Sequence, residues 1–404
     1  MTLNSNIETA IVGIGQTAVG LLPGRHSTGL YIEAAQRAIE DCGIPRHEID
    51  GLLTSASVVD DNVRHHMIIA EHLGLFCKNL CDTMRTGGAA FGQALQLAQW
   101  AVQAGRCKAV LVVAADNLLS GPGKGHGVST YTGLGAHSLE FEVPYGAQIP
   151  SFYSLVAERH MHEYGTTPEQ LASIAVACRK HASLNPSAQK RELISVEDVL
   201  TSRMIASPLH LLDCSLISDG GGAFIVTSLE RARDLKKRPI RVLGIGQSQS
   251  YYHMGHLAAG VGLPDGRKGE FNLTNTVQKI AAEQAFGEAG LRPSDIDVAQ
   301  LYDSFTITAL LQFEDLGFCK KGEGGAFVED GRIELGGELP VNTHGGLLSF
   351  AHPGMPGGIF HMIEGVSQLR HECEDRQVLD AQVALVTNVS AVASNHSVCI
   401  LGRD

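Results

Sequence analysis

The sequence predicts a duplicated α/β protein, and three observations support this fold class. Residues 34–50 (AAQRAIEDCGIPRHEID) return as residues 281–297 (AAEQAFGEAGLRPSDID). An apolar, strand-like run lies upstream of each copy and ends in nearly the same word, VGIGQT at 12–17 and LGIGQS at 243–248. In both halves, short β-rich runs alternate with amphipathic helical stretches, which is typical of βαβ units and a largely parallel sheet. We therefore expect a pseudo-symmetric body with a site at the seam.

The predicted elements follow the same order in both halves. Strands are expected at 8–13, 51–55, 109–114 and 223–227 in the first half, and at 240–244, 298–301, 383–387 and 398–401 in the second. Helices are expected at 29–42, 88–104, 278–289 and 359–370. Gly43 and Gly290 lie where a helix end favours a residue that tolerates positive φ.

Two domains are predicted, residues 1–236 and 237–404. The first contains an insertion at about 118–206, and such insertions usually build a lid, a cap or an oligomer contact. The second contains a shorter one, rich in Gly and His, at 251–269.

Composition limits the class of protein. The 404 residues are 44% apolar and 18% charged, as in folded rather than disordered chains. The net charge of −12 argues against binding a nucleic-acid backbone, which needs a basic face. No apolar run reaches the ~20 residues of a membrane span, and the N-terminus lacks a signal-peptide pattern. Nine scattered cysteines without a C-x-x-C pair fit reduced intracellular thiols. We expect a soluble cytoplasmic protein.

Two patterns that resemble cofactor sites are interpreted otherwise. The G-x-G-x-x-A run from Gly13 has the spacing of a dinucleotide fingerprint, but turn residues follow at Gly20 where the fingerprint must open a helix. A strand-to-loop bend is expected instead. Three histidine pairs, at 65–66, 160–162 and 253–256, lack carboxylates or thiols at ligand spacing, so no metal site is expected.

A helix start in the first half has a counterpart in the second. Gly87-Gly88 opens a helix, where free N–H groups and partial positive charge suit an oxyanion or an activated nucleophile. The matching stretch, 342–358, contains His344 and His352. His352 lies between turns with no helix or strand face to fill, which favours a functional role. Pseudo-symmetry would bring the two stretches together.

Tyr302-Asp303-Ser304 follows a predicted strand, at the carboxyl edge where α/β proteins collect ligands. Asp303 or Ser304 could serve only as a helix cap. A tyrosine hydroxyl has no such structural role there, so the segment is a candidate site.

Together, the duplicated halves, the insertion and the GG-x-x-x-x-x-HP-G stretch resemble the thiolase superfamily. More narrowly, the chain is similar to sterol-carrier-protein-type thiolases and their bacterial lipid-transfer-protein and aldolase relatives. The phrases that carry the resemblance span the chain: EYGTTPEQLA (163–172), HASLNP (181–186), SRMIASPLHLLDCSLISDGGGA (202–223), EAGLRPSDID (288–297), YDSFT (302–306) and NTHGGLLSFAHPG (342–354). The resemblance implies a layered α/β/α/β/α fold, a loop domain in the first half, and a homodimer formed through sheet pairing of first halves.

The chain departs from these thiolases where their chemistry occurs. Their nucleophilic cysteine corresponds to Met84, whose thioether yields no thiolate and forms no acyl-enzyme. Tyr302 and Ser304 replace the His and Cys of the family's H-D-C-F word, and Asn388 stands at the place of another cysteine. The histidine of the GHP motif is kept as His352. The pattern resembles the thiolase-like aldolases of steroid side-chain degradation, in which a Tyr-Asp pair takes part in retro-aldol cleavage and a second tyrosine replaces that histidine.

That resemblance implies roles for the residues of the site. Tyr302 would handle the proton of the β-hydroxyl, with Asp303 orienting or tuning it. His352 would donate to the thioester oxygen, helped by N–H groups near Gly87 and Gly88. Supporting positions are His344 and Ser304. Coenzyme A enters as part of the substrate, with no permanently bound cofactor, and its anionic groups are expected near Arg85, Lys124, Arg267 and Lys268.

Three functions stay open from the sequence. The first is retro-aldol cleavage of a β-hydroxyacyl-CoA. The second is thiolase-type acyl transfer by Claisen condensation or thiolysis. The third is non-catalytic binding of acyl-CoA or lipid, with the chemistry in a partner. The resemblance implies an OB-fold and zinc-ribbon partner protein. The sequence does not identify the acyl group, and a steroid side chain, a terpenoid and an aromatic acid all stay open.

Overall fold

A nine-stranded sheet runs through both halves of the computed structural model, which describes residues 7–60, 62–121, 140–251, 253–258 and 270–404. The first half supplies β1 (Thr9–Gln16), β2 (Ile49–Ser55), β3 (Leu80–Met84), β4 (Ala109–Asn117) and β7 (Asp219–Ser228). The second supplies β8 (Ile240–Gln249), β9 (Val298–Gln300), β10 (Val383–Ser390) and β11 (Asn395–Arg403). The strand order is β3-β2-β4-β7-β1-β8-β11-β10-β9. Every predicted strand is present, whereas β3 was not predicted.

The sheet is mixed, so the prediction of a largely parallel sheet is wrong. β2 pairs in parallel with β3 and β4, and β9 with β10. The other neighbours are antiparallel, because the last long strand of each half, β7 or β11, inserts between two earlier strands and runs against both. β1 also pairs with β8, Ala10 opposite Arg241, and this pairing joins the two halves into one sheet.

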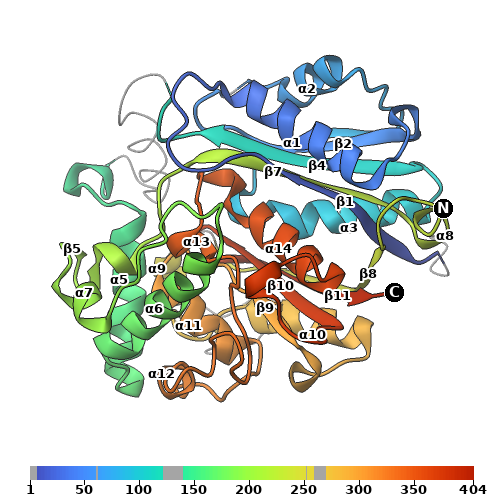
Figure 1. The fold of residues 1–404 in the computed structure, drawn as a ribbon. Coiled ribbons are helices and arrows are strands. Elements are labelled where there is room, and N and C mark those ends of the chain that lie inside the picture. The colour runs from blue at the N-terminus through green and yellow to red at the C-terminus, as the bar shows by residue number, and fades with distance from the viewer. Residues whose placement is uncertain (1–6, 61, 122–139, 252, 259–269) are drawn as a thin grey trace.

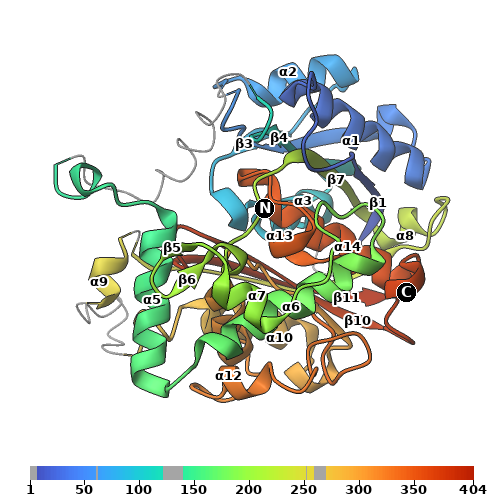
Figure 2. The same ribbon diagram turned by 60° about the vertical axis from the view of Figure 1, so that its left-hand side comes forward.

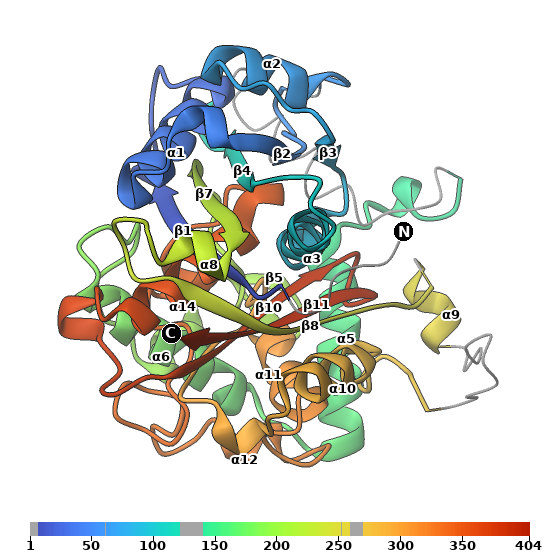
Figure 3. The ribbon, with the colours of Figure 1, turned by 90° about the vertical axis from the view of Figure 1, so that its right-hand side faces the viewer.

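Helices form layers on both sides of each half of the sheet. α1 (Ser27–Cys42) and α2 (His65–Leu73) cover the outer face of the first half, and α10 (Gln278–Ala289) covers that of the second (Figure 1). α3 (Ala90–Gln103) and α14 (Ile359–Arg370) lie between the halves and contact strands of both (Figure 3). The four predicted helices are confirmed, and the residues that end α1 and α10 adopt φ of 69° and 67°, as expected for their glycines.

The repeated G-x-G words mark close contact between a strand and a helix. Gly13 and Gly15 lie within β1, and a Cβ on either would collide with a backbone carbonyl of α1. Gly244 and Gly246 in β8 stand in the same relation to α10. The predicted strand-to-loop bend is therefore wrong, since the glycines stay in the strand and allow the helix to approach.

Residues 140–206 of the insertion pack beside the second half (Figure 2). Its helices are α5 (Ile149–Tyr164), α6 (Pro168–Leu184) and α7 (Val196–Thr201). α5 and α6 contact α11 (Thr306–Asp315), the helix that follows the Tyr302 segment. A buried pair joins α5 to α11, with Nε2 of His160 3.1 Å from Oε2 of Glu314. The insertion is thus anchored to the second half. In the described part of the chain, no helix is both long and apolar enough to cross a membrane.

Candidate active site

A pocket of about 340 Å³ lies where the two halves and the insertion meet. The first half contributes Arg85–Gly88, the insertion contributes Ile149 and Tyr153, and the second half contributes Tyr302, Ser304 and most of the 389–395 turn. The short helices η2 (Gly87–Ala89) and η6 (Met355–Gly358) contact each other beside it. The predicted meeting of the two glycine-rich stretches is therefore confirmed.

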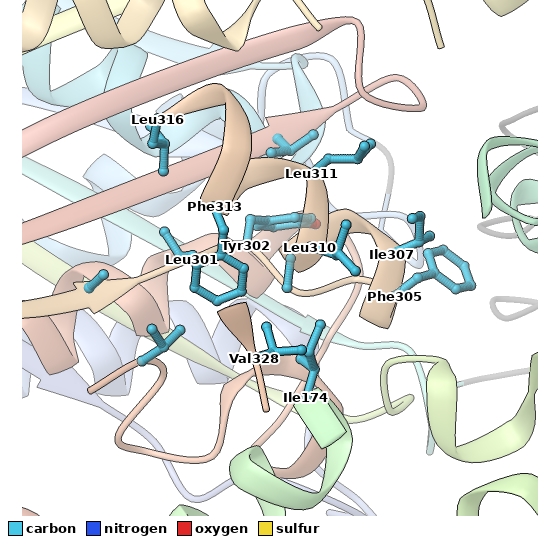
Figure 4. Close-up of a cluster of buried hydrophobic side chains, with 14 of the residues drawn as sticks. Ile174, Leu301, Tyr302, Phe305, Ile307, Leu310, Leu311, Phe313, Leu316 and Val328 are labelled. Atoms are coloured by element: carbon cyan, nitrogen blue, oxygen red, sulfur yellow. The ribbon is translucent and has the colours of Figure 1, made fainter. Parts of the chain in front are cut away.

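Tyr302 is held from both ends at the wall of this pocket. Its N–H donates to Oγ1 of Thr387 (3.1 Å), and its carbonyl accepts from Nε2 of Gln312 (2.7 Å). Its ring lies in the apolar cluster of the second half (Figure 4), and the residue is 4% exposed. The hydroxyl Oη lies 3.2 Å from Nε2 of His352. The packing therefore fixes the phenol at the wall of the pocket, which Tyr302 lines.

His352 lies behind Tyr302 and links it to a serine. Its Nδ1 is 3.2 Å from Oγ of Ser215, and burial lowers its pKa from 6.5 to about 4, so the imidazole is neutral near pH 7. A neutral imidazole has one N–H and one acceptor nitrogen. When Nε2 accepts from Tyr302, Nδ1 donates to Ser215. The three side chains then form a chain that can pass a proton from the pocket to the imidazole.

The segment that contains Ser215 is held against both partners. The N–H of Ser215 donates to the carbonyl of Ser304 (2.9 Å). Ser218 accepts at Oγ from the N–H of His352 (2.9 Å) and donates its own N–H to that residue's carbonyl (3.2 Å). In the sequence, this segment contributes to the family resemblance. It predicts no role for Ser215 or Ser218, because loop serines follow no periodic pattern.

Asp303 faces away from the pocket, toward the start of α13 (Gly346–Ser349). Its carboxylate accepts from the N–H groups of Leu347 (2.8 Å) and Leu348 (3.2 Å), and lies 3.4 Å from Nε2 of His361. Burial acts to raise the pKa of Asp303, but His361 and the Leu347 N–H outweigh it and the pKa falls below its ordinary value. An ionised Asp303 therefore fixes the loop before His352.

Glycines leave room for the Tyr302–His352 pair. A Cβ on Gly88 would stand 2.5 Å from the Tyr302 hydroxyl, and one on Gly357 would stand 2.9 Å from Nε2 of His352. Neither glycine has positive φ, so their role here is close approach rather than backbone freedom. Gly87, by contrast, has φ 64°.

Of three other residues from the sequence prediction, two lie near the pair and one does not. Ser304 lines the pocket, with Oγ 3.1 Å from Oγ1 of Thr308. Asn388 donates from Nδ2 to the carbonyl of Gly358 (3.2 Å). Met84, at the end of β3, packs against the central apolar cluster and does not line the pocket.

His344 belongs to a different cavity. It lines a polar space of about 230 Å³ with Glu364 and Arg376, and its ring packs edge-on against His361 at 5.0 Å between centroids. Neither ring nitrogen has a hydrogen-bond partner among the described residues, and burial lowers the pKa of His344 well below its ordinary value. Its support of the Tyr302 pocket is therefore indirect.

Of the four predicted CoA-binding cations, Arg85 lies within the described residues. Arg85 is exposed and lines the pocket, which fits a contact with an anionic group of CoA. Lys124, Arg267 and Lys268 lie outside the described residues.

One wall of the pocket is a strained turn between β10 and β11. Ala391, Val392 and Ala393 have φ of 50°, 50° and 60°, the left-handed region that is unfavourable for a β-branched residue. Nε2 of His396 lies 2.7 Å from the carbonyl of Ala393 and accordingly donates to it. Burial lowers the pKa of His396 from 6.5 to about 4, so a neutral ring holds the turn.

The His396→Asn variant should lose less stability than the wild type when the pH falls. The unfolded state takes up a proton at this histidine near pH 6.5, while the folded state does so only near 4. In the wild type, the stability that the neutral His396 ring contributes is therefore fully present above pH 6.5. It is lost as the pH falls from 6.5 to 4, at up to about 1.4 kcal/mol per pH unit. Urea unfolding of both proteins at pH 7 and pH 5.5 measures the difference. Parallel losses in the two proteins would contradict the neutral, buried ring.

The comparisons with known proteins identify the family. A family model described as Thiolase C-terminal domain-like matches residues 268–403. An acetyl-CoA acetyltransferase of Methanothermobacter thermautotrophicus is 35% identical over 98% of this chain and 100% of its own length. The chain belongs to the thiolase superfamily. It belongs to the branch of the sterol-carrier-protein-2-type thiolases, as predicted.

Two further thiolase relatives are aldolases or lyases by name. The 17-hydroxy-3-oxo-4-pregnene-20-carboxyl-CoA lyase of Mycobacterium tuberculosis is 37% identical, over 90% of this chain and 92% of its own. The solved structure of the Ltp2-ChsH2(DUF35) aldolase superposes with a TM-score of 0.84 at 34% identity, covering 98% of each chain. This thiolase-like enzyme therefore has relatives at similar identity with different activities on CoA thioesters.

Proposed function

We propose that the protein cleaves a β-hydroxyacyl-CoA by a retro-aldol reaction, without a cysteine nucleophile. The observation that supports this most is the Tyr302 hydroxyl, 3.2 Å from the neutral His352, at the wall of the pocket. Among the described residues, no cysteine lines that pocket. A proton-transfer pair without a nucleophile suits a reaction that forms no acyl-enzyme.

In the proposed step, Tyr302 takes the proton of the substrate β-hydroxyl while passing its own to Nε2 of His352. The O–H electron pair becomes the new carbonyl, the Cα–Cβ bond breaks, and its electrons form the thioester enolate. The α-carbon then takes a proton back through Tyr302, which releases a ketone or aldehyde and a shorter acyl-CoA. His352 thus acts through Tyr302, in place of the contact with the thioester oxygen expected from the resemblance.

The transfer must be concerted with bond cleavage. Free phenol has a pKa of about 10, and burial holds the pKa of His352 at about 4. Full transfer from phenol to imidazole would cost about 8 kcal/mol at 1.36 kcal/mol per pKa unit. Tyr302 therefore serves as a relay and never as a free phenolate. The N–H groups of Gly87 and Gly88 are assigned to the thioester oxygen. Arg85 is assigned to an anionic group of CoA.

The test uses the substrate named for the mycobacterial lyase, in which the 17-hydroxyl is β to the thioester. The protein is incubated with that CoA ester, alone and with a ChsH2(DUF35)-type subunit like the one named in the related structure. We expect a 17-ketone and a three-carbon acyl-CoA by mass spectrometry. No cleavage in either mixture would exclude this substrate class, and cleavage only with the subunit would establish the partner.

Thiolase-type acyl transfer is the second candidate, favoured by the acetyltransferase relative. Radiolabelled acetyl-CoA would then leave label on a cysteine after denaturation. We expect none. An unlabelled protein that also cleaves nothing with the subunit would leave acyl-CoA or lipid binding as its function.

A homodimer through the edge of the sheet is proposed as well. β3 is the outermost strand of the first half, so one of its edges is available for pairing with a second copy. Sedimentation at micromolar concentration would reveal the dimer, and a monomer at that concentration would contradict the proposal.

The Gly88→Ala variant should reduce cleavage by about 100-fold, in the range reported for loss of a positioned acid–base group. The added methyl would start 2.4 Å from the carbonyl oxygen of Val389 and 2.5 Å from the Tyr302 hydroxyl, so it would push on β10 and displace the hydroxyl from His352. Gly29→Ala, where a Cβ meets nothing within 4 Å, is the matched control and should keep wild-type kcat. Equal activity in the two variants would show that the Tyr302 position is not critical.

A further inference from the structure

The pocket contains a second phenol, Tyr153, which comes from the insertion and to which the sequence assigned no role. It lies in the same buried cluster as Tyr302, on α5, and is 4% exposed. Its ring packs against Phe305 with centroids 4.6 Å apart and an interplanar angle of 31°. The residue is therefore fixed in the wall of the pocket that Tyr302 also lines, and not on a surface loop.

The anchoring of α5 gives Tyr153 a defined position. Tyr153 and His160 are seven residues apart, so they share one face of the helix. His160 is joined to Glu314 on α11, and α11 begins directly after the Tyr302–Phe305 segment. The same helix pair thus sets the position of Tyr153 relative to Tyr302.

The N–H groups of Gly87 and Gly88 are assigned to the thioester, and a side-chain donor beside them is a further need of the proposed cleavage that His352 does not meet. The departing electrons collect on the thioester oxygen, and a donor in the pocket must stabilise that charge. The two ring nitrogens of His352 already have partners behind the wall of the pocket. Nε2 lies 3.2 Å from the Tyr302 hydroxyl, and Nδ1 lies 3.2 Å from the Ser215 hydroxyl. Two other hydroxyls of the pocket are already donating, that of Thr86 to Gln93 and that of Ser394 to the carbonyl of Ala391.

Tyr153 meets that need. A phenol is more acidic than an alcohol, so it is the stronger donor to an enolate oxygen. Burial raises the pKa of Tyr153 above its ordinary value, against hydrogen bonds with Ser304, the Ala393 backbone and Thr308 that act to lower it, so the hydroxyl keeps its proton at neutral pH. Its surroundings allow donation without loss of the proton.

We propose that Tyr153 is a catalytic residue whose hydroxyl donates a hydrogen bond to the thioester oxygen as the enolate forms. The proposal rests on the proposed retro-aldol function and names the residue that stabilises its charged product. Tyr302 moves protons, whereas Tyr153 keeps its proton throughout. No bond to Tyr153 is made or broken, and the atoms balance as in the cleavage itself.

The test compares Tyr153→Phe with Tyr145→Phe, an 87% exposed tyrosine of the same insertion. Two rates are measured: cleavage of the pregnene carboxyl-CoA, and exchange of the α-protons of acetyl-CoA in D₂O. We expect Tyr153→Phe to lower kcat and exchange by about 10²-fold or more, as for loss of an oxyanion donor. KM should change little and the melting temperature should stay unchanged, because the ring still packs on Phe305. Tyr145→Phe should match wild type in every measurement.

The outcomes separate the two proposals. Wild-type cleavage with unchanged kcat and exchange in Tyr153→Phe would overturn the role of Tyr153 and leave the retro-aldol function standing. A loss confined to KM would also overturn it, since it would make Tyr153 a binding residue. Absence of wild-type cleavage would overturn the proposed function, and the exchange rate would then still report whether Tyr153 stabilises an enolate.

Discussion

The Tyr302→Phe variant is expected to cleave the β-hydroxyacyl-CoA about 10³-fold more slowly than wild type, within the range for loss of a general acid–base group. The substitution removes only Oη, which lies 3.2 Å from His352. The ring keeps its place in the apolar cluster, and the backbone bonds to Thr387 and Gln312 persist. KM and the melting temperature should therefore stay close to those of wild type.

A second buried tyrosine provides the control for this prediction. Tyr31 is fully buried under the first half of the sheet, and its hydroxyl donates to the carbonyl of Ser55 at 2.8 Å. Tyr31→Phe should cost about 1 kcal/mol of stability and leave kcat unchanged. Full activity in Tyr302→Phe would remove Tyr302 from the mechanism, whatever happens at Tyr31.

The His352→Ala variant is expected to lose about 10²- to 10³-fold in kcat, because Tyr302 then loses the imidazole that accepts its proton. In the wild type, the pKa of about 4 predicts the pH at which activity disappears. The acceptor form of the imidazole is present above pH 4 and is lost below it. The plot of kcat/KM against pH should be level from about 5 to 7 and fall toward 4.

The position of that acid limb is the decisive measurement. A limb centred near 6.5, the ordinary value, would mean that His352 is solvated and not held behind Tyr302. Ser215→Ala offers a graded comparison, since it removes the partner of Nδ1 and leaves the ring. Its loss of kcat should be smaller than that of His352→Ala, with the limb still below 6.5.

The sequence predicted the strands and helices well, but not the direction of the strands. Alternation of β and α segments indicated crossovers, and hence parallel neighbours. The connection between β10 and β11 runs only from Ser390 to Asn395, too short for the dozen or more residues that a crossover needs. That length was a readable sign of an antiparallel pair. β3 was missed because an edge strand that is half exposed has a weak apolar pattern.

The candidate site could be predicted only in part. Tyr302 and His352 were found because they stand at motif positions, and the structure brings their side chains together. Ser215 and Tyr153 were missed because their roles depend on contacts between distant segments, which no local pattern encodes. Tyr153 lies on an amphipathic helix, where an aromatic residue is expected to fill a core. Only the placement of α5 brings it to the pocket.

The pairing of β1 with β8 places one residue, Ala10, opposite its own counterpart in the repeat. The repeat aligns Val12 with Leu243, so Arg241 is the counterpart of Ala10, and these two residues face each other across the antiparallel pair. A local two-fold axis therefore passes through that point. The chain has the geometry of an isologous dimer whose subunits were fused end to end. Because one polypeptide contains both copies, each could change separately, and the position equivalent to Tyr302 in the first copy is Ser55.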